Sequence, residues 1–179
     1  CLMKKKLFTS LIILFLTSTQ VTFAASQNAT VSVKVSPIFS LTLDTASIDF
    51  GSVAVGKFAE LPEGSGYLNK ATCKSNNGNV WRLTIQANNN LSSGANEIPI
   101  NSLKWLMTYT SGANPLIPHP TTQGYVDFKT SPEVVYESTA AEGSNLPNGT
   151  DIQFKYAMYL PESQAAGNYQ TTVIYTLTE

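Results

Sequence analysis

The residues best suited to acid–base or nucleophilic chemistry are few in this sequence and poorly placed for it. The only histidine, His119, stands between Pro118 and Pro120. A catalytic imidazole has to be held rigidly by a third group, and a proline-flanked histidine in a loop does not meet that requirement. The sequence therefore predicts no nucleophile–histidine system and no catalytic residue.

Paired carboxylates are the next residues that could support acid–base catalysis. Glu133 with Glu137, or Asp127 with Asp151, could form an acid pair of the kind that cleaves glycosidic bonds, but their spacing singles out neither pair. Residues 49–51 spell the Asp-Phe-Gly of the kinase metal motif, without the glycine-rich loop and catalytic loop that normally accompany it. We interpret this tripeptide as the end of a strand and expect the protein not to be an enzyme.

Metal and cofactor sites are not expected either. The sequence has two cysteines and one histidine, too few for a zinc site unless carboxylates complete it, and no calcium-loop spacing. Cys1 precedes the predicted export signal, so Cys73 would be the single cysteine of the mature chain. With only Lys70 and Lys74 nearby to lower its pKa, we expect a half-buried, inert thiol; the alternative is an intermolecular disulfide.

The N-terminus has the pattern of a bacterial signal peptide. A basic stretch at 4–6 follows Met3, the expected start, and an apolar run at 7–16 precedes small residues at Thr22 and Ala24. We predict a signal peptide over residues 1–24 and a secreted chain at the bacterial cell surface. The apolar run is well below the roughly 20 residues of a spanning helix, so no membrane span is expected after cleavage.

Composition narrows the class of partner. Charged residues make up 13% of the chain, about half the usual share, and the formal net charge is −1. Nucleic-acid binding leaves a basic footprint that this sequence lacks, so no nucleic-acid partner is expected.

A two-residue alternation of apolar and polar side chains runs through almost the whole chain and is typical of half-buried strands. Two long alternating runs come last, at 152–160 and 169–177, and shorter ones lie upstream at 39–43, 81–85 and 105–109. No long 3.6-residue stripe predicts a core helix. We therefore predict an all-β fold, a two-sheet antiparallel immunoglobulin-like sandwich of about eight to ten strands, as a single domain over residues 25–179.

The aromatic residues leave two interpretations open. Trp81 and Trp105 head strand faces, and Tyr175 lies in the last alternating run. Exposed, such rings would stack on a sugar; buried, they would anchor the core of a sandwich. Trp81 and Trp105 share their alternation with Leu83 and Met107, which favours the core.

Most of the predicted mature chain resembles the WxL domain, a cell-wall-associated β domain of Gram-positive surface proteins. The resemblance rests on residues 81–83, Trp-Arg-Leu, on residues 166–169, Ala-Gly-Asn-Tyr, and on the final Tyr-Thr-Leu at 175–177, where WxL domains normally begin with Trp. It implies a noncovalent cell-wall or glycan-binding module, acting through Trp81 or Trp105.

A second resemblance is to secreted pilin-like subunits, including spore-coat-U-type and chaperone–usher proteins. It rests on residues 49–53, Asp-Phe-Gly-Ser-Val, on Cys73 followed by Trp81, and on a closing strand pair that joins Leu-Pro at 160–161 to Gly-Asn-Tyr at 167–169. Those subunits usually pair the early cysteine with a second one, which this chain lacks after signal removal. The resemblance implies a structural or adhesive surface protein that binds itself or other surface proteins.

The start of the mature chain is consistent with such assembly. Val31, Val33 and Val35 alternate with polar residues, as in a strand that leaves its own domain to complete a neighbour's sheet. The alternative is that this run is simply the first strand of its own domain. We expect strand pairing between subunits, with the wall or glycan module as the second hypothesis.

Overall fold

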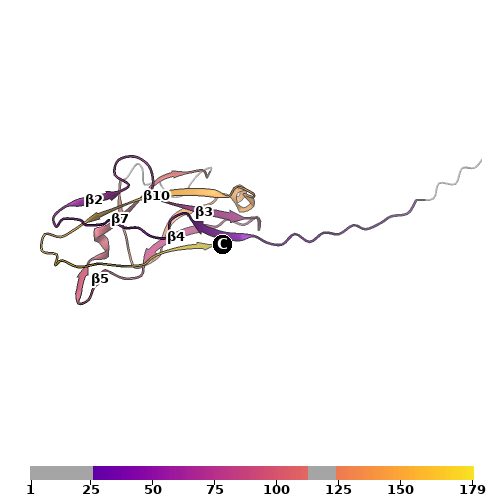
Figure 1. Ribbon diagram of the computed structural model, residues 1–179. Coiled ribbons are helices and arrows are strands. Elements are labelled where there is room, and N and C mark those ends of the chain that lie inside the picture. The colour runs from indigo at the N-terminus through magenta and orange to yellow at the C-terminus, as the bar shows by residue number, and fades with distance from the viewer. Residues whose placement is uncertain (1–25, 113–123) are drawn as a thin grey trace, which may run out of the picture. The chain divides into compact units, whose positions relative to one another are not determined.

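The computed structural model describes residues 26–112 and 124–179, and within them the protein is all-β (Figure 1). The predicted signal peptide and His119 lie outside the described residues. In the part described, no helix has the length and apolarity needed to cross a membrane. Residues Val35–Glu179 form one compact unit, and residues 26–34 fall outside it.

The larger sheet is antiparallel and is built around β10, the longest strand. Its order is β1-β3-β10-β7-β8, and β2 also pairs with β10, beyond the end of β3. The strands are β1 (Phe39–Leu43), β2 (Phe58–Leu61), β3 (Asn69–Ser75), β7 (Leu103–Thr110), β8 (Val126–Asp127) and β10 (Thr150–Tyr159).

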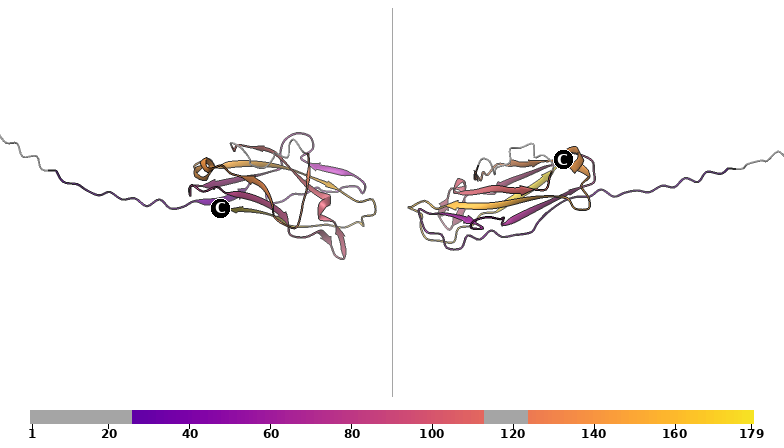
Figure 2. Two further views of the ribbon diagram at one scale, coloured as in Figure 1. Left: turned by 180° about the vertical axis from the view of Figure 1, so that it is seen from behind. Right: turned by 90° about the horizontal axis from the view of Figure 1, so that it is seen from above.

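The second sheet is also antiparallel and has the order β11-β4-β9. Its strands are β4 (Arg82–Ala87), β9 (Glu133–Glu137) and β11 (Val173–Thr178); a hairpin of β5 (Leu91–Ser93) and β6 (Asn96–Ile98) and two short turns of 3₁₀ helix, η1 (Ile100–Ser102) and η3 (Ala140–Ser144), complete the described elements. Figure 2 shows the strands from two further sides, running lengthwise in layers. The prediction of an all-β antiparallel sandwich is confirmed.

The core lies between the two sheets and follows the alternation of the strands. Ile152, Phe154 and Tyr156 of β10 belong, with Leu83 and Ile85 of β4, to one buried hydrophobic cluster. Full burial of such side chains contributes roughly 1.5–3 kcal/mol each, which stabilises a sandwich without any disulfide.

Two predicted strands differ from the structure. Residues 31–35 have the alternation of a strand but are not paired with one in the described chain. The last predicted strand, 169–177, pairs continuously with β4 only from Val173 onward. Before that, Gln170 forms only an isolated bridge to Ser92. Alternation predicts which side chains can share a face, whereas a strand also needs a neighbouring backbone.

Candidate functional site

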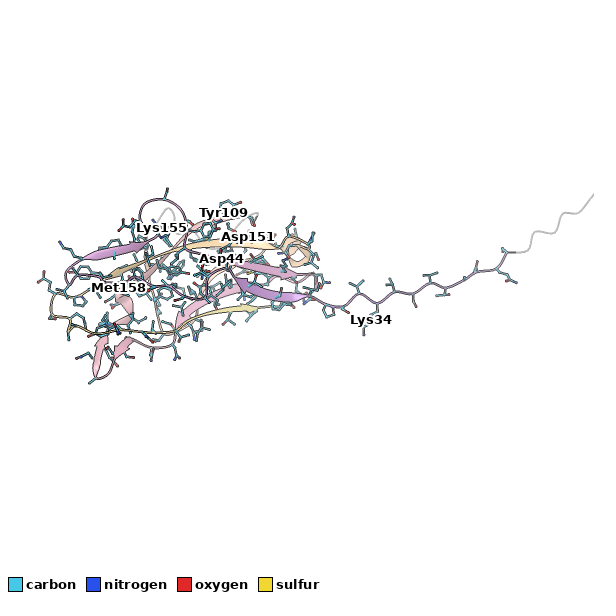
Figure 3. The ribbon with its side chains drawn as sticks, viewed as in Figure 1. Lys34, Asp44, Tyr109, Asp151, Lys155 and Met158 are labelled. Atoms are coloured by element: carbon cyan, nitrogen blue, oxygen red, sulfur yellow. The ribbon has the colours of Figure 1, made fainter. Side chains whose placement is uncertain are left out.

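A groove runs along one side of the sandwich, between residues 43–55 and residues 164–175. We call it the seam; its volume is about 930 Å³. Leu103 and Met158 line it from the larger sheet, and Leu91 and Ile98 line it from the hairpin. Figure 3 labels Met158, which is buried near the end of β10. Side chains of the hydrophobic core thus form part of the surface of this groove.

One wall of the seam is residues 45–55, which we call the strap. The strap is attached at both ends: the Thr45 hydroxyl donates to the Leu68 carbonyl at 3.1 Å, and Gly56 N, just after the strap, donates to the Leu160 carbonyl at 2.8 Å. Between these ends, residues 46–55 make no backbone–backbone hydrogen bond with any other described residue. The strap therefore covers the core without belonging to a sheet.

The side chains of the strap alternate in burial even though it is not a strand. Ile48 and Phe50 are half-buried and pack against the core, whereas Asp49 between them is exposed. One Asp49 carboxylate oxygen, Oδ1, accepts a hydrogen bond from Gly51 N at 2.8 Å. Gly51 has φ +61°, a left-handed conformation that glycine adopts without strain, and this turn ends the alternation.

The other wall is the chain that leads into and includes β11. On one side this chain is fully engaged: β11 pairs with β4, Asn88 N donates to the Thr172 carbonyl at 2.8 Å, and Gln170 and Ser92 exchange two hydrogen bonds. On the other side, no described strand pairs with β11. Its outer edge presents backbone donors and acceptors, which is the usual template for pairing with another strand.

A cluster of hydroxyl groups lies at the inner side of the seam. The Tyr156 and Tyr175 hydroxyls hydrogen bond to each other, and Asn69 Nδ2 donates to the Tyr156 hydroxyl at 3.4 Å. Asn69 and Tyr175 line the seam. Burial raises the pKa of Tyr156 to about 12 and the pKa of Tyr175 well above its usual 10. Both hydroxyls therefore stay protonated at neutral pH and serve as structural hydrogen-bonding groups.

These raised pKa values predict a loss of stability in alkali. A tyrosine whose pKa is higher in the folded than in the unfolded chain stabilises the fold below pH 10, and this contribution is lost as pH rises through the folded pKa. We expect the free energy of unfolding to fall above pH 10. Stopped-flow absorbance at 295 nm, with circular dichroism, should show a late tyrosinate phase that coincides with unfolding; ionisation of all tyrosines before unfolding would contradict this expectation.

Both tryptophans that were candidates for sugar stacking are buried. Trp81 is 0% and Trp105 is 3% exposed. The Trp81 indole stacks on Tyr136 at 5.3 Å and donates from Nε1 to the Glu142 carbonyl at 3.1 Å, and the Trp105 ring meets the Phe154 ring edge-on. These indoles offer no free face to a ligand and act as core residues.

The candidate strand-pairing valines are exposed. Val31 is 93%, Val33 is 88% and Val35 is 74% exposed. A lone exposed valine is ordinary, but three at alternate positions place one apolar edge of an extended segment in water.

The thiol of Cys73 is buried on β3 and unpaired within the described residues. Burial raises its pKa to about 12, so the reactive thiolate is absent at neutral pH. In this fold, a disulfide to another chain would require β3 to open.

The candidate acid pairs are not brought together as pairs. Glu137 binds Arg82 at 2.9 Å, and Glu133 binds Lys129 at 2.8 Å. Asp127 binds Lys104, and Asp151 binds Lys70 at 3.3 Å. Each carboxylate is thus neutralised by its own cation near the surface, and no group of three potential metal ligands gathers among residues 26–112 and 124–179.

The seam was not identified from the sequence. Residues 49–51, which the sequence predicts as the end of a strand, lie instead in the unpaired strap. The sequence signal for an unpaired segment is alternation interrupted by Gly51 and Gly56. In the structure both glycines have positive φ, which breaks the regular strand geometry. No family model matches the chain, and no curated protein matches it.

Proposed function

We propose that this protein is a non-catalytic structural subunit of an extracellular surface assembly, joined by strand pairing between copies. The extended segment 26–35 of one copy would enter the seam of the next. The observation that carries this proposal is the seam itself, a groove with both apolar and polar lining beside an unpaired strand edge, in a chain that also exposes an alternating apolar segment.

The backbone of the seam supplies the affinity in this arrangement. The outer edge of β11 has unpaired N–H and C=O groups, and an added strand would satisfy them in the way that peptides extend sheets. The strap does not compete for these groups through its own backbone, since residues 46–55 form no backbone–backbone hydrogen bond in the described chain. The strap therefore leaves the backbone groups of this edge unpaired.

The side chains supply further energy. Val31, Val33 and Val35 lie at alternate positions, so in an extended segment they share one face. Facing inward, they would meet the half-buried Ile48, Phe50 and Val173 that line the seam. Burial of a valine contributes up to roughly 1.5–3 kcal/mol, so three of them are of the same order as the backbone entropy lost when a five-residue segment is ordered, about 1–2 kcal/mol per residue. The strand hydrogen bonds supply the rest of the docking free energy.

The same reasoning favours assembly over glycan binding. A glycan module acting through Trp81 or Trp105 needs an exposed indole, and both indoles are buried.

The test is assembly of the chain that begins at Ala25, measured by light scattering on a sizing column. We expect a ladder of oligomers that an excess of a synthetic peptide of residues 26–35 reduces to monomers. The control peptide has the same composition with its valines placed at consecutive positions, and it should have no effect. A stable monomer that binds neither peptide would refute the proposed function.

A further inference from the structure

The valine pattern alone does not determine how an incoming strand is placed along the seam. Because side chains alternate with period two, a slip of one residue turns every valine outward and is strongly disfavoured. A slip of two residues puts valines back on the inner face. The repeat Val31, Val33, Val35 therefore distinguishes the two faces of the segment but discriminates weakly between registers two residues apart.

A pair of opposite charges, one in the seam and one in the segment, could select a single register. Among the described residues that line the seam, Asp49 is the only charged one. Residues 26–35 likewise contain one charged residue, Lys34. The two charges are opposite. Figure 3 labels Lys34 on its extended stretch of chain.

The surroundings of the two residues also correspond. Lys34 lies between Val33 and Val35, and Asp49 lies between the half-buried Ile48 and Phe50. With the valines directed inward, Lys34 would face outward, on the same side as the exposed Asp49. Each segment therefore has an apolar–charged–apolar triplet that presents its charge at the rim of the seam.

Asp49 has the capacity to take a cation. Its Oδ1 accepts the hydrogen bond from Gly51 N, and within the described chain neither of its carboxylate oxygens forms an ion pair. By contrast, the neighbouring Asp44, labelled in Figure 3, is used within the fold, where its Oδ1 accepts from Lys70 N at 2.6 Å.

We propose that Asp49 recognises Lys34 of a second copy of this chain and thereby sets the register of the docked strand. This inference rests on the proposed function. The apolar face of the segment drives docking, and the rim ion pair selects one among registers that the valines tolerate about equally. An exposed pair contributes little energy, but a small difference is sufficient to choose between near-equal registers.

The test is a charge-swap cycle. The acceptor is the chain from Ala25 carrying Val33→Asp, which disables its own segment, and the probe is a fluorescent peptide of residues 26–35. We expect Asp49→Lys in the acceptor, or Lys34→Asp in the peptide, to weaken binding about three- to tenfold, and the double swap to restore most of it. The effect should shrink in 1 M salt because exposed charges are screened. Glu63→Lys, the same charge change at an exposed position outside the seam, should leave binding within about twofold.

A second readout reports the register directly. A carbodiimide joins contacting amines and carboxylates without a spacer, and mass spectrometry should place the Lys34 cross-link at Asp49. Cross-linking to Asp44 or Glu162 instead, or single swaps that are additive in the double swap, would overturn the register assignment while leaving strand docking intact. Failure of the unmodified peptide to bind any acceptor would overturn the proposed function itself.

Discussion

Replacing Val33 with aspartate is expected to abolish assembly of the chain while leaving its compact unit folded. Val33 is the central member of the inward-facing set in the proposed docked segment. An aspartate there would be directed at the half-buried Ile48, Phe50 and Val173, in a seam whose described lining contains no cation. The cost of burying an unpaired carboxylate is several kcal/mol, equivalent to a loss of docking affinity of about a hundredfold or more. Since Val33 lies outside the compact unit, the melting temperature should stay within about 1 °C of the unmodified chain.

The neighbouring residue provides a matched control. Ser32→Asp adds the same carboxylate one position away, on the opposite face of the alternation, where it would remain in water. Sizing with light scattering should show monomers for Val33→Asp and oligomers for Ser32→Asp. Equal assembly of the two variants would mean that docking does not depend on which face of this segment carries the apolar side chains.

Replacing Glu142 with alanine is expected to cause the largest loss of fold stability, about 3–5 kcal/mol. Glu142 is 7% exposed as a residue, and its carboxylate accepts four hydrogen bonds. One oxygen accepts from the Tyr136 hydroxyl at 2.5 Å and from Thr150 Oγ1 at 3.1 Å, and the other accepts from the backbone and side chain of Thr139. Alanine would leave several buried donors without a partner at one end of the core.

The Glu142 network also holds the first tryptophan. The Glu142 carbonyl accepts from Trp81 Nε1, and Tyr136 stacks on Trp81, so a shift of η3 would disturb the core directly. Together with burial, the hydrogen bond to Glu142 raises the pKa of Tyr136 well above its usual value, which keeps the tyrosine a donor.

Urea denaturation measures the effect of the Glu142 variant. Glu142→Gln retains one carbonyl acceptor and should lose less stability, about 1–2 kcal/mol, while Glu63→Ala at an exposed position should change it by under about 0.5 kcal/mol. A Glu142→Ala chain within about 1 kcal/mol of the unmodified one would show that the donors find other partners. Peptide binding at the seam should survive in the folded fraction, since Glu142 does not line it.

Strong alternation allowed several elements to be predicted from the sequence. The runs around Phe154 and Tyr175 became β10 and β11, because β-branched and aromatic side chains at every second position suit a pleated, half-buried surface. The β3 strand was not predicted, although its side chains alternate in burial. Its inward residues, Asn69, Ala71, Cys73 and Ser75, are small or polar, so hydropathy does not mark their face.

Of the candidate site, the sequence predicted the pairing segment but not the groove that could accept it. The alternation of Val31, Val33 and Val35 identified a segment suited to pairing, but the groove that could accept it lies between parts of the chain more than 100 residues apart. Whether Trp81 and Trp105 faced water or the core was likewise a question of what packs against them.

The sequence by itself determined the all-β class and the faces of the longest strands, since both follow from local periodicity. Tertiary structure alone decided which edges have partners, that the strap lies unpaired over the core, and that Glu142 is buried among neutral donors. These properties depend on hydrogen bonds between residues distant in the chain, and no local pattern specifies the partner of a backbone group.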